Sequence, residues 1–160
     1  MKKIIISAVL ALMLVAVLAV PAMGDDITAS VTVTEYASVT VTDNGTAGLS
    51  FGSMTPGQDM KAEAASPSVT VTAAAENNID LDIKVSGTDF SDGGSNSFSI
   101  GNAYYNTASD SGSASAMSTT PATVDTLSAG EHVDIYHWLS VPEEQAAATY
   151  DSTFTYVGES

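Results

Sequence analysis

The stretch Ile27-Thr28-Ala29-Ser30-Val31-Thr32-Val33-Thr34 decides the fold, because apolar and small polar side chains alternate along it without exception. Successive side chains of a β-strand point to opposite faces, so this alternation is typical of a strand with one buried face. Helical periodicity is nearly absent from the chain. The period-two pattern recurs in residues 37–42, 69–71, 79–85, 98–100, 133–141 and 150–156. Short strands at this spacing predict an all-β protein, a single Ig-like or jelly-roll β-sandwich.

The first predicted turn is Asp43-Asn44-Gly45-Thr46, which separates two strand candidates. A loop with an odd number of residues places Val41 opposite Leu49, and Val39 opposite Phe51, with all four side chains on one face. We therefore predict a hairpin with a three- or five-residue loop.

A second predicted turn, Glu76-Asn77-Asn78, separates residues 69–75 from residues 79–85 and predicts another hairpin. Residues 106–123 differ from the rest, because they are mostly Ser, Thr and Ala, and Met117 is their only large apolar side chain. Such a segment buries little apolar surface, and we predict a mobile surface loop.

The N-terminus has the pattern of a secretory signal peptide. Lys2-Lys3 precedes an apolar run over residues 4–20, and Ala22-Met23-Gly24 supplies small residues before a cut ahead of Asp25. The alternative is a membrane anchor, but the run is at the lower limit of the ~17–25 residues that span a bilayer. We predict that residues 1–24 are cleaved, which leaves no membrane span and a secreted protein, outside the cell or on its surface.

The predicted mature chain is strongly acidic and contains no cysteine. All 19 acidic residues follow residue 24, whereas only Lys61 and Lys84 remain as basic residues. A surface of this charge repels nucleic acid and anionic lipid, so no nucleic-acid partner is predicted. Secretion permits disulfides, but with 0 cysteines the fold depends on its core or on assembly.

The length of the first strand candidate carries the functional hypothesis. Residues 27–42 would extend roughly 50 Å, whereas a compact domain of this size is roughly 36 Å across. Either the strand bends at a β-bulge at Glu35-Tyr36 and pairs twice within the domain, or residues 25–35 form an arm that leaves a β-sandwich of residues 36–160. The apolar stripe of that arm is Ile27, Ala29, Val31 and Val33.

An arm of this kind is an aggregation hazard unless a partner takes it up. Its addition to the sheet edge of a neighbour is a head-to-tail contact, which propagates into a filament. The arm therefore predicts a structural subunit of an extracellular filament, pilus or cell-surface layer, a homopolymer assembled by strand donation. The alternative is a monomeric binding or adhesin-like module for a surface glycan or protein, with an aromatic platform of Tyr104, Tyr105, Tyr136 and Trp138.

Two segments carry a resemblance to known proteins. Leu49-Ser50-Phe51-Gly52-Ser53-Met54-Thr55-Pro56-Gly57 resembles the LxFGxxxPG element of secreted bacterial and archaeal Ig-like surface domains. Trp138-Leu139-Ser140-Val141-Pro142, with Ala148-Thr149-Tyr150 and Thr153-Phe154-Thr155-Tyr156 after it, resembles their closing hairpin. The layout is similar to TasA/camelysin-type proteins and archaeal donor-strand filament subunits. The resemblance implies a β-sandwich and polymerisation, and it implies no catalytic residue.

The candidates for catalysis are weak, and we predict that the chain is not an enzyme. Gly48-Leu49-Ser50-Phe51-Gly52 matches the G-x-S-x-G nucleophile elbow, but the segment has strand character and no helical pattern follows it. His132 and His137 are separated by an odd number of positions within a strand, so they face opposite sides and cannot share a metal. His137 has the parity of Ile135 and Leu139, which predicts a core histidine.

Candidate ligands for Ca²⁺ lie in one turn. Asp89, Asp92 and Asn96 surround a flexible Gly93-Gly94 pair, and Ca²⁺ takes oxygen ligands from such loops. A plain acidic turn is the alternative, and no other cofactor is predicted. A second, weaker candidate is the pair Asp80 and Asp82. Asn44, in Asn44-Gly45-Thr46, is the acceptor of an N-glycosylation sequon at the predicted hairpin tip.

Overall fold

The structure is a computed structural model that describes residues 30–45 and 48–160. Thr34–Ser160 forms one compact unit, and Met1–Val33 is a separate unit. The predicted signal peptide of residues 1–24, and Ile27 and Ala29 of the apolar stripe, lie outside the described residues.

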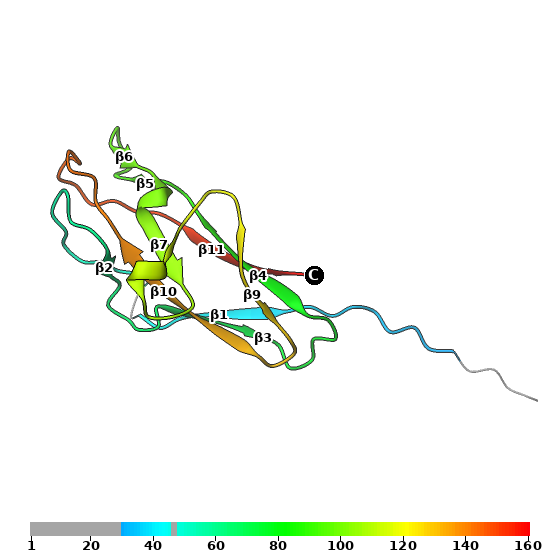
Figure 1. The fold of residues 1–160 in the computed structure, drawn as a ribbon. Helices are drawn as coiled ribbons and strands as arrows, with labels where there is room; N and C mark the ends of the chain where they lie inside the picture. The colour runs from blue at the N-terminus through cyan, green and yellow to red at the C-terminus, as the bar shows by residue number, and fades with distance from the viewer. Residues whose placement is uncertain (1–29, 46–47) are drawn as a thin grey trace, which may run out of the picture. The chain divides into compact units, whose positions relative to one another are not determined.

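The larger sheet is antiparallel and contains six strands (Figure 1). Its main path runs β1–β3–β10–β7–β8, and β2 also pairs with β10. The Val, Ile and Thr residues of these segments favour extended backbone, and their alternation places one face of the sheet inward. The strands are β1 (Val39–Asp43), β2 (Lys61–Ala62), β3 (Val69–Ala73), β7 (Ala103–Asn106), β8 (Ser115–Ala116) and β10 (His132–Leu139).

The smaller sheet has three strands in the order β11–β4–β9, and all of its pairings are antiparallel. Figure 1 shows β11 and β4 side by side along their length. These strands are β4 (Leu81–Gly87), β9 (Ala122–Leu127) and β11 (Phe154–Glu159). β5 (Phe90–Ser91) and β6 (Ser97–Phe98) form a short hairpin of their own that bridges to Asp151, and single 3-10 turns occupy Ile100–Asn102 and Ser111–Ser113.

The core lies between the two sheets and confirms the all-β sandwich. In β3 and β4 alternate residues are buried, as the period-two pattern predicts. One buried cluster contains Val69, Val71, Ala73, Leu81, Ile83, Leu127, Val133 and Ile135. A second contains Val85, Phe90, Phe98, Ile100, Ala103, Met117 and Leu139.

The predicted hairpin at residues 43–46 is wrong. Val41 lies opposite Val71 of β3 rather than Leu49, and residues 48–54 form no strand, so the expected strand character of the G-x-S-x-G segment is wrong as well. The Asp43 carboxylate instead accepts hydrogen bonds from the backbone N–H groups of Gly45 (2.8 Å) and Gly48 (2.6 Å). These two bonds hold a loop at the end of β1, where the sequence suggested a simple hairpin turn.

The predicted hairpin at residues 76–78 is also wrong. β3 belongs to the larger sheet and β4 to the smaller one, so this connection crosses between the layers. Parity did not reveal this, because both strands bury alternate residues in the same interior.

The predicted loop over residues 106–123 contains secondary structure. The short strand β8 pairs with β7, and Met117 is only 3% exposed. Asn106 Nδ2 donates to the Asp110 backbone oxygen (2.9 Å) and to Ser113 Oγ (2.9 Å). One buried methionine and a local network of side-chain hydrogen bonds therefore order this segment. It lacks the alternating apolar pattern from which ordered structure is usually predicted.

Candidate assembly groove

Exposed apolar side chains are concentrated near the N-terminal end of the described chain. Four large hydrophobic residues are exposed in residues 30–45 and 48–160: Val31 (87%), Val33 (77%), Tyr36 (52%) and Val41 (43%). Residues 30–38 form no strand, although the sequence predicted strands over residues 27–34 and 37–42. Within the second of these segments, β1 begins only at Val39.

Two asparagine side chains hold the chain ahead of β1. The Asn78 amide accepts from the Tyr36 N–H (2.9 Å) and donates to the Thr34 carbonyl (2.9 Å). The Asn77 amide accepts from the Ser38 N–H (2.9 Å) and donates to the Ser38 carbonyl (3.0 Å). Each side-chain amide supplies one acceptor and one donor, as a neighbouring strand would. Residues 34–38 are therefore held without belonging to a sheet.

β1 ends the larger sheet and leaves one backbone edge free. Ala74 N–H donates to the Ser38 carbonyl, and Asn44 N–H donates to the Ser68 carbonyl. The even-numbered residues of β1 thus form the hydrogen-bonded pairs with β3, and the backbone groups of the odd-numbered residues face the other way. Among the described residues no backbone partner meets the outward groups of Val39, Val41 and Asp43.

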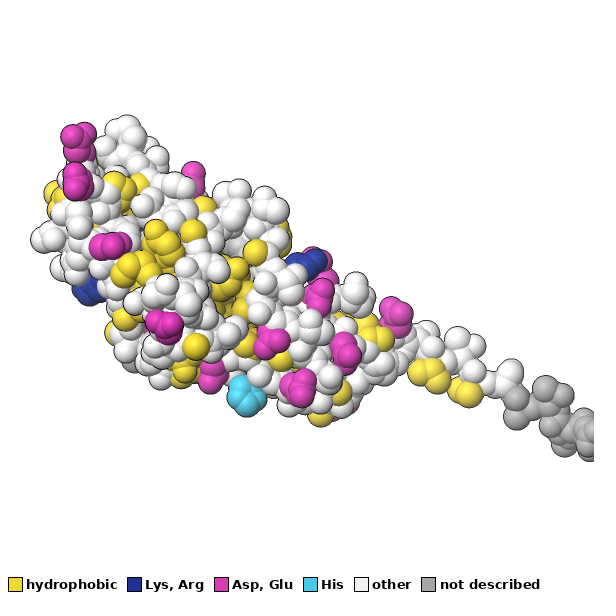
Figure 2. All heavy atoms as spheres, in the orientation of Figure 1, with side chains coloured by type: hydrophobic (Ala, Val, Ile, Leu, Met, Phe, Trp, Pro, Cys, Tyr) yellow, Lys and Arg dark blue, Asp and Glu magenta, His cyan; other side chains and the backbone are white. Residues whose placement is uncertain are grey.

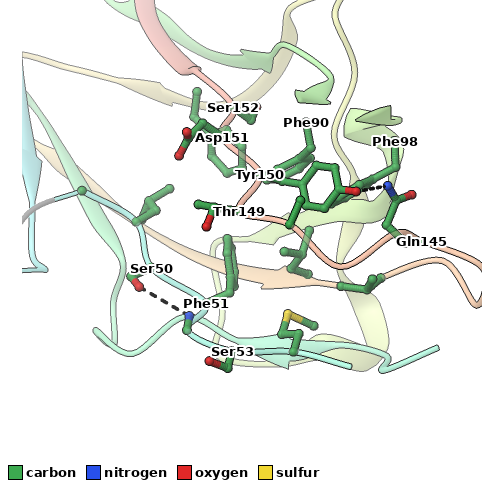
Figure 3. A pocket seen from close by; sticks show the side chains of 18 of the residues that line it. Ser50, Phe51, Ser53, Phe90, Phe98, Gln145, Thr149, Tyr150, Asp151 and Ser152 are labelled. Atoms are coloured by element: carbon green, nitrogen blue, oxygen red, sulfur yellow. Dashed lines mark hydrogen bonds between the residues drawn. The ribbon is translucent and has the colours of Figure 1, made fainter. Parts of the chain in front are cut away.

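A groove of about 1010 Å³ opens beside this edge (Figure 3). One wall is formed by residues 48–54, and the other by residues 145–152, which lead into β11. The two segments that carry the resemblance described above contribute to both walls. The apolar part of the lining includes Val41, Leu49, Phe51, Phe98, Tyr150 and Phe154. Its aromatic residues pack on one another: Phe98 stacks on Phe90 with ring centroids 4.7 Å apart, and Tyr150 meets Phe98 edge-on at 5.2 Å.

Hydrogen bonds fix both walls of the groove. Glu63 is 6% exposed, and its carboxylate accepts from the N–H groups of Ser50 (3.3 Å) and Ala65 (2.6 Å). On the other side Gln145 Nε2 donates to the Tyr150 hydroxyl (2.6 Å), which donates to the Ala146 carbonyl (2.9 Å). Figure 3 shows the Gln145–Tyr150 bond across this wall. The groove is thus a preformed feature of the sandwich.

A buried hydrogen bond between the two sheets lies behind Tyr156, one of the residues that line the groove. The Tyr156 hydroxyl of β11 lies 3.1 Å from Nε2 of His137 in β10. Burial lowers the pKa of His137 from 6.5 to about 4. Burial, together with the Asp43 carboxylate, raises the pKa of Tyr156 above its ordinary value of 10.0. Both groups are therefore uncharged at neutral pH, and this buried pair adds no charge behind the groove lining.

The structure confirms that the two histidines face opposite sides, since His132 is exposed and His137 is 1% exposed. His137 is a core residue, as its parity predicted. Its Nδ1 atom, however, has no hydrogen-bond partner among the described residues. The predicted core histidine is therefore only half satisfied.

The candidate calcium ligands form a turn that is closed by their own hydrogen bonds. Asp92 accepts from Asn96 Nδ2 (2.6 Å) and from the Gly94 N–H (2.7 Å), and these bonds lower the pKa of its carboxyl. Asp89 Oδ1 accepts from the Ile100 N–H (2.8 Å). In the part of the chain that the structure describes, no three His, Asp or Glu side chains are grouped to hold a metal ion. Calcium binding by Asp89, Asp92 and Asn96 stays a prediction.

The remaining candidates are dispersed. Asn44 Nδ2, the atom that a glycan would modify, donates to Thr70 Oγ1 (2.9 Å), and Thr46 of the sequon lies outside the described residues. Asp82 accepts from Thr126 Oγ1 (2.8 Å) on the outer face of the smaller sheet. Of the four aromatic platform residues, Tyr104, Tyr136 and Trp138 share one face of the β7–β10 pair, and Tyr105 lies on the other face opposite His137. Trp138 is 6% exposed and the other three are half-buried, and the binding platform stays a prediction.

On the face that Figure 2 shows, acidic side chains are scattered over the sandwich and do not gather in one patch. No helix among residues 30–45 and 48–160 has the length and apolarity needed to cross a membrane.

Comparisons with protein-family models, with curated proteins and with solved structures find no match to this chain.

Sequence reasoning missed the groove. Nothing in the sequence indicated that Glu63 is buried in a wall of the groove, because an isolated glutamate is usually exposed to solvent. The walls are irregular segments without period-two alternation, so strand patterns do not indicate them. The available signal was the cluster Leu49, Phe51 and Met54, in which three large apolar residues lie between glycines.

Proposed function

We propose that this chain is a secreted structural subunit that polymerises into an extracellular filament, pilus or cell-surface layer by donating its N-terminal strand. The observation that carries the proposal is the exposure of Val31 and Val33, at 87% and 77%. Both belong to the uncharged alternating stretch of residues 27–34. An unpartnered apolar stripe of this kind is expected to find a partner strand or to aggregate.

Energetics favour the donation of this segment. Complete burial of a valine side chain stabilises by about 1.5–3 kcal/mol, and strand addition supplies main-chain hydrogen bonds in addition. Export after removal of residues 1–24 is part of the proposal, since an extracellular polymer requires it. A catalytic role is not proposed.

Visualisation of the secreted protein tests this function. Negative-stain microscopy and size-exclusion chromatography at rising concentration should reveal polymers of the wild-type protein. Val31→Asp should prevent them, because an unpaired charge would enter an apolar contact. Thr32→Asp is the matched control: it adds the same charge on the opposite strand face, and it should weaken assembly much less.

A monomer at every concentration contradicts the proposal and favours the monomeric binding module. Equal loss of assembly in the Val31→Asp and Thr32→Asp proteins also contradicts strand donation, because a strand distinguishes its two faces.

A further inference from the structure

We infer that the groove between residues 48–54 and 145–152 is the acceptor site, and that its occupant is the segment of residues 27–33 from a second copy of this chain. The inference rests on the proposed function and names the partner surface that the function requires. The donated segment lies between the free edges of β1 and β11, with its apolar side chains inside the groove.

The β11 edge, like the β1 edge, has backbone groups available there. Thr88 N–H donates to the Thr153 carbonyl (3.0 Å), so the odd-numbered residues of β11 form the hydrogen-bonded pairs with β4. The N–H and C=O groups of Phe154 and Tyr156 therefore face away from β4, and both residues line the groove. Among residues 30–45 and 48–160 neither edge has a strand partner, so an inserted strand would meet unpaired backbone groups on each side.

Val41 shows that this side of the sandwich lacks a covering strand. Val41 lies directly opposite Val71 in the β1–β3 ladder, so both side chains point to the same inner face. Val71 is 0% exposed, whereas Val41 is 43% exposed. A residue on the core-facing side of a strand is exposed to this degree only where the opposing layer is incomplete.

The chemistry of the segment fits the groove. Residues 27–34 contain no charged side chain, and their odd positions are Ile, Ala, Val and Val. These small and branched side chains match a cleft lined by Leu49, Phe51 and Phe154. Asp25, Asp26 and Glu35 flank the segment and remain at its ends. The groove lining includes two carboxylates, Asp43 and Asp151, so an uncharged segment avoids the repulsion that an acidic segment would meet there.

Geometry favours a second copy over the chain's own segment. Thr34 and Ser38 are held by Asn78 and Asn77 ahead of β1, whereas Val41 and Asp43, which line the groove, lie toward the far end of that strand. From Thr34 to Val41 the extended chain covers about 23 Å, and residues 27–33 also cover about 23 Å. If the segment folded back, only its first residue would reach Val41, and nothing would be left to fill the groove beyond it.

A peptide tests the acceptor separately from the polymer. The probe is a fluorescent peptide of residues 25–35, and the acceptor is the full chain with Val31→Asp, whose own segment is inactive. Fluorescence anisotropy should show saturable binding. The peptide that itself carries Val31→Asp should bind at least 10-fold more weakly. Because Ala148 is an exposed residue of the groove wall, adding Ala148→Trp to the acceptor should abolish binding.

Ala129→Trp is the matched control, because Ala129 is an exposed alanine in the β9–β10 turn that does not line the groove. This variant should bind the peptide as the parent does. Circular dichroism checks that the Ala148→Trp protein is folded, and Thr149→Trp, on the same wall, is the second blocking variant if it is not.

Mixing two variants completes the test. The Val31→Asp protein keeps an open groove, and the Ala148→Trp protein keeps an intact donor segment. Each should be monomeric alone, and a mixture should form one-to-one dimers that do not grow. Equal peptide binding to open and blocked grooves, or filaments made by the Ala148→Trp protein, overturns the acceptor assignment while the filament function stands. Peptide binding in the groove of a wild-type protein that never polymerises overturns the function and leaves the acceptor standing.

Discussion

Strands β1 and β3 begin with the same four residues, Val-Thr-Val-Thr, and they pair with each other, yet their burial differs. In β3 the valines at positions 69 and 71 are 3% and 0% exposed. In β1 Val41 is 43% exposed, and none of the five residues is buried. The pair shows that sequence alternation sets which face a side chain takes, whereas the neighbouring strands determine whether that face is covered.

The difference follows from position in the sandwich. β3 has β1 on one side and β10 on the other, and the core between the sheets covers its inner face. β1 has one partner strand among the described residues, and its other edge opens on the groove. Each of the four predictions below tests this contrast between the closed and the open side, from the largest expected effect to the smallest.

The same substitution in the two strands should have very different costs. Val71→Asp places an unpaired charge in the core and should lower the free energy of unfolding by at least about 4 kcal/mol. Val41→Asp should cost less than about 1 kcal/mol in the monomer, because its side chain already reaches water. Urea denaturation of both proteins measures the difference. Similar losses would mean that the open side is closed in solution.

The pH dependence of stability tests whether water reaches His137, behind the groove residue Tyr156. The folded pKa of His137 is depressed to about 4, so its contribution is present above pH 6.5 and is lost as the pH falls toward 4. Over that interval the wild-type protein should lose about 3 kcal/mol more stability than His137→Gln. Denaturation series at several pH values measure both slopes. His132→Gln, on the exposed face, is the control, and equal slopes for wild type and His137→Gln would mean that water reaches the His137 imidazole.

Gly158 marks where the open side ends. A Cβ atom at this position would lie 2.7 Å from Val39 Cγ1, so β1 and β11 touch here. Gly158→Ala should cost about 2 kcal/mol through overpacking. Combining it with Val39→Ala should recover part of that loss, which a double-mutant cycle measures. Additive losses would place the two strands farther apart.

The smallest effect concerns the two asparagines ahead of β1. Asn78→Ala removes two exposed hydrogen bonds and should cost about 1 kcal/mol or less. Hydrogen exchange should accelerate at the Tyr36 amide and stay slow at the Ser38 amide, because Asn77 still holds the latter. Acceleration at both amides would show that residues 34–38 are released as one unit.

Sequence alone predicted the fold class and the strands β1, β3, β4, β10 and β11, because alternation of Val, Ile and Thr reports directly on one-sided burial. It missed β7 and β9, which have a weaker alternation of large apolar residues. The sequence analysis did not predict which strands pair with one another. Parity made Leu49 a good partner for Val41, but Val71 offered the same side-chain type on the same face and belonged to a longer alternating segment. Likewise, no pattern distinguishes a turn at Asn77-Asn78 that returns to the same sheet from one that crosses to the other layer.

The sequence predicted the apolar stripe of the candidate site but not the groove. The apolar stripe has the period of a strand, and its described members Val31 and Val33 are exposed, although residues 30–38 form no strand; its role as a donor is the proposal above. The groove is built by irregular backbone that depends on Glu63 and Gln145, whose roles arise only from contacts distant in sequence. A pattern of local periodicity carries no information on such contacts.

The Asn77 and Asn78 side chains also have a mechanical consequence. Their hydrogen bonds hold residues 34–38, which precede β1 directly. Tension applied at Thr34 along that strand therefore acts on the two amides before it acts on Val39. The bonds of the β1–β3 ladder are perpendicular to the strands, so a pull along β1 shears them together rather than opening them one at a time. The two amides would share that load with the ladder, and a chain without them would transmit the whole of the force to the first pair of strand residues.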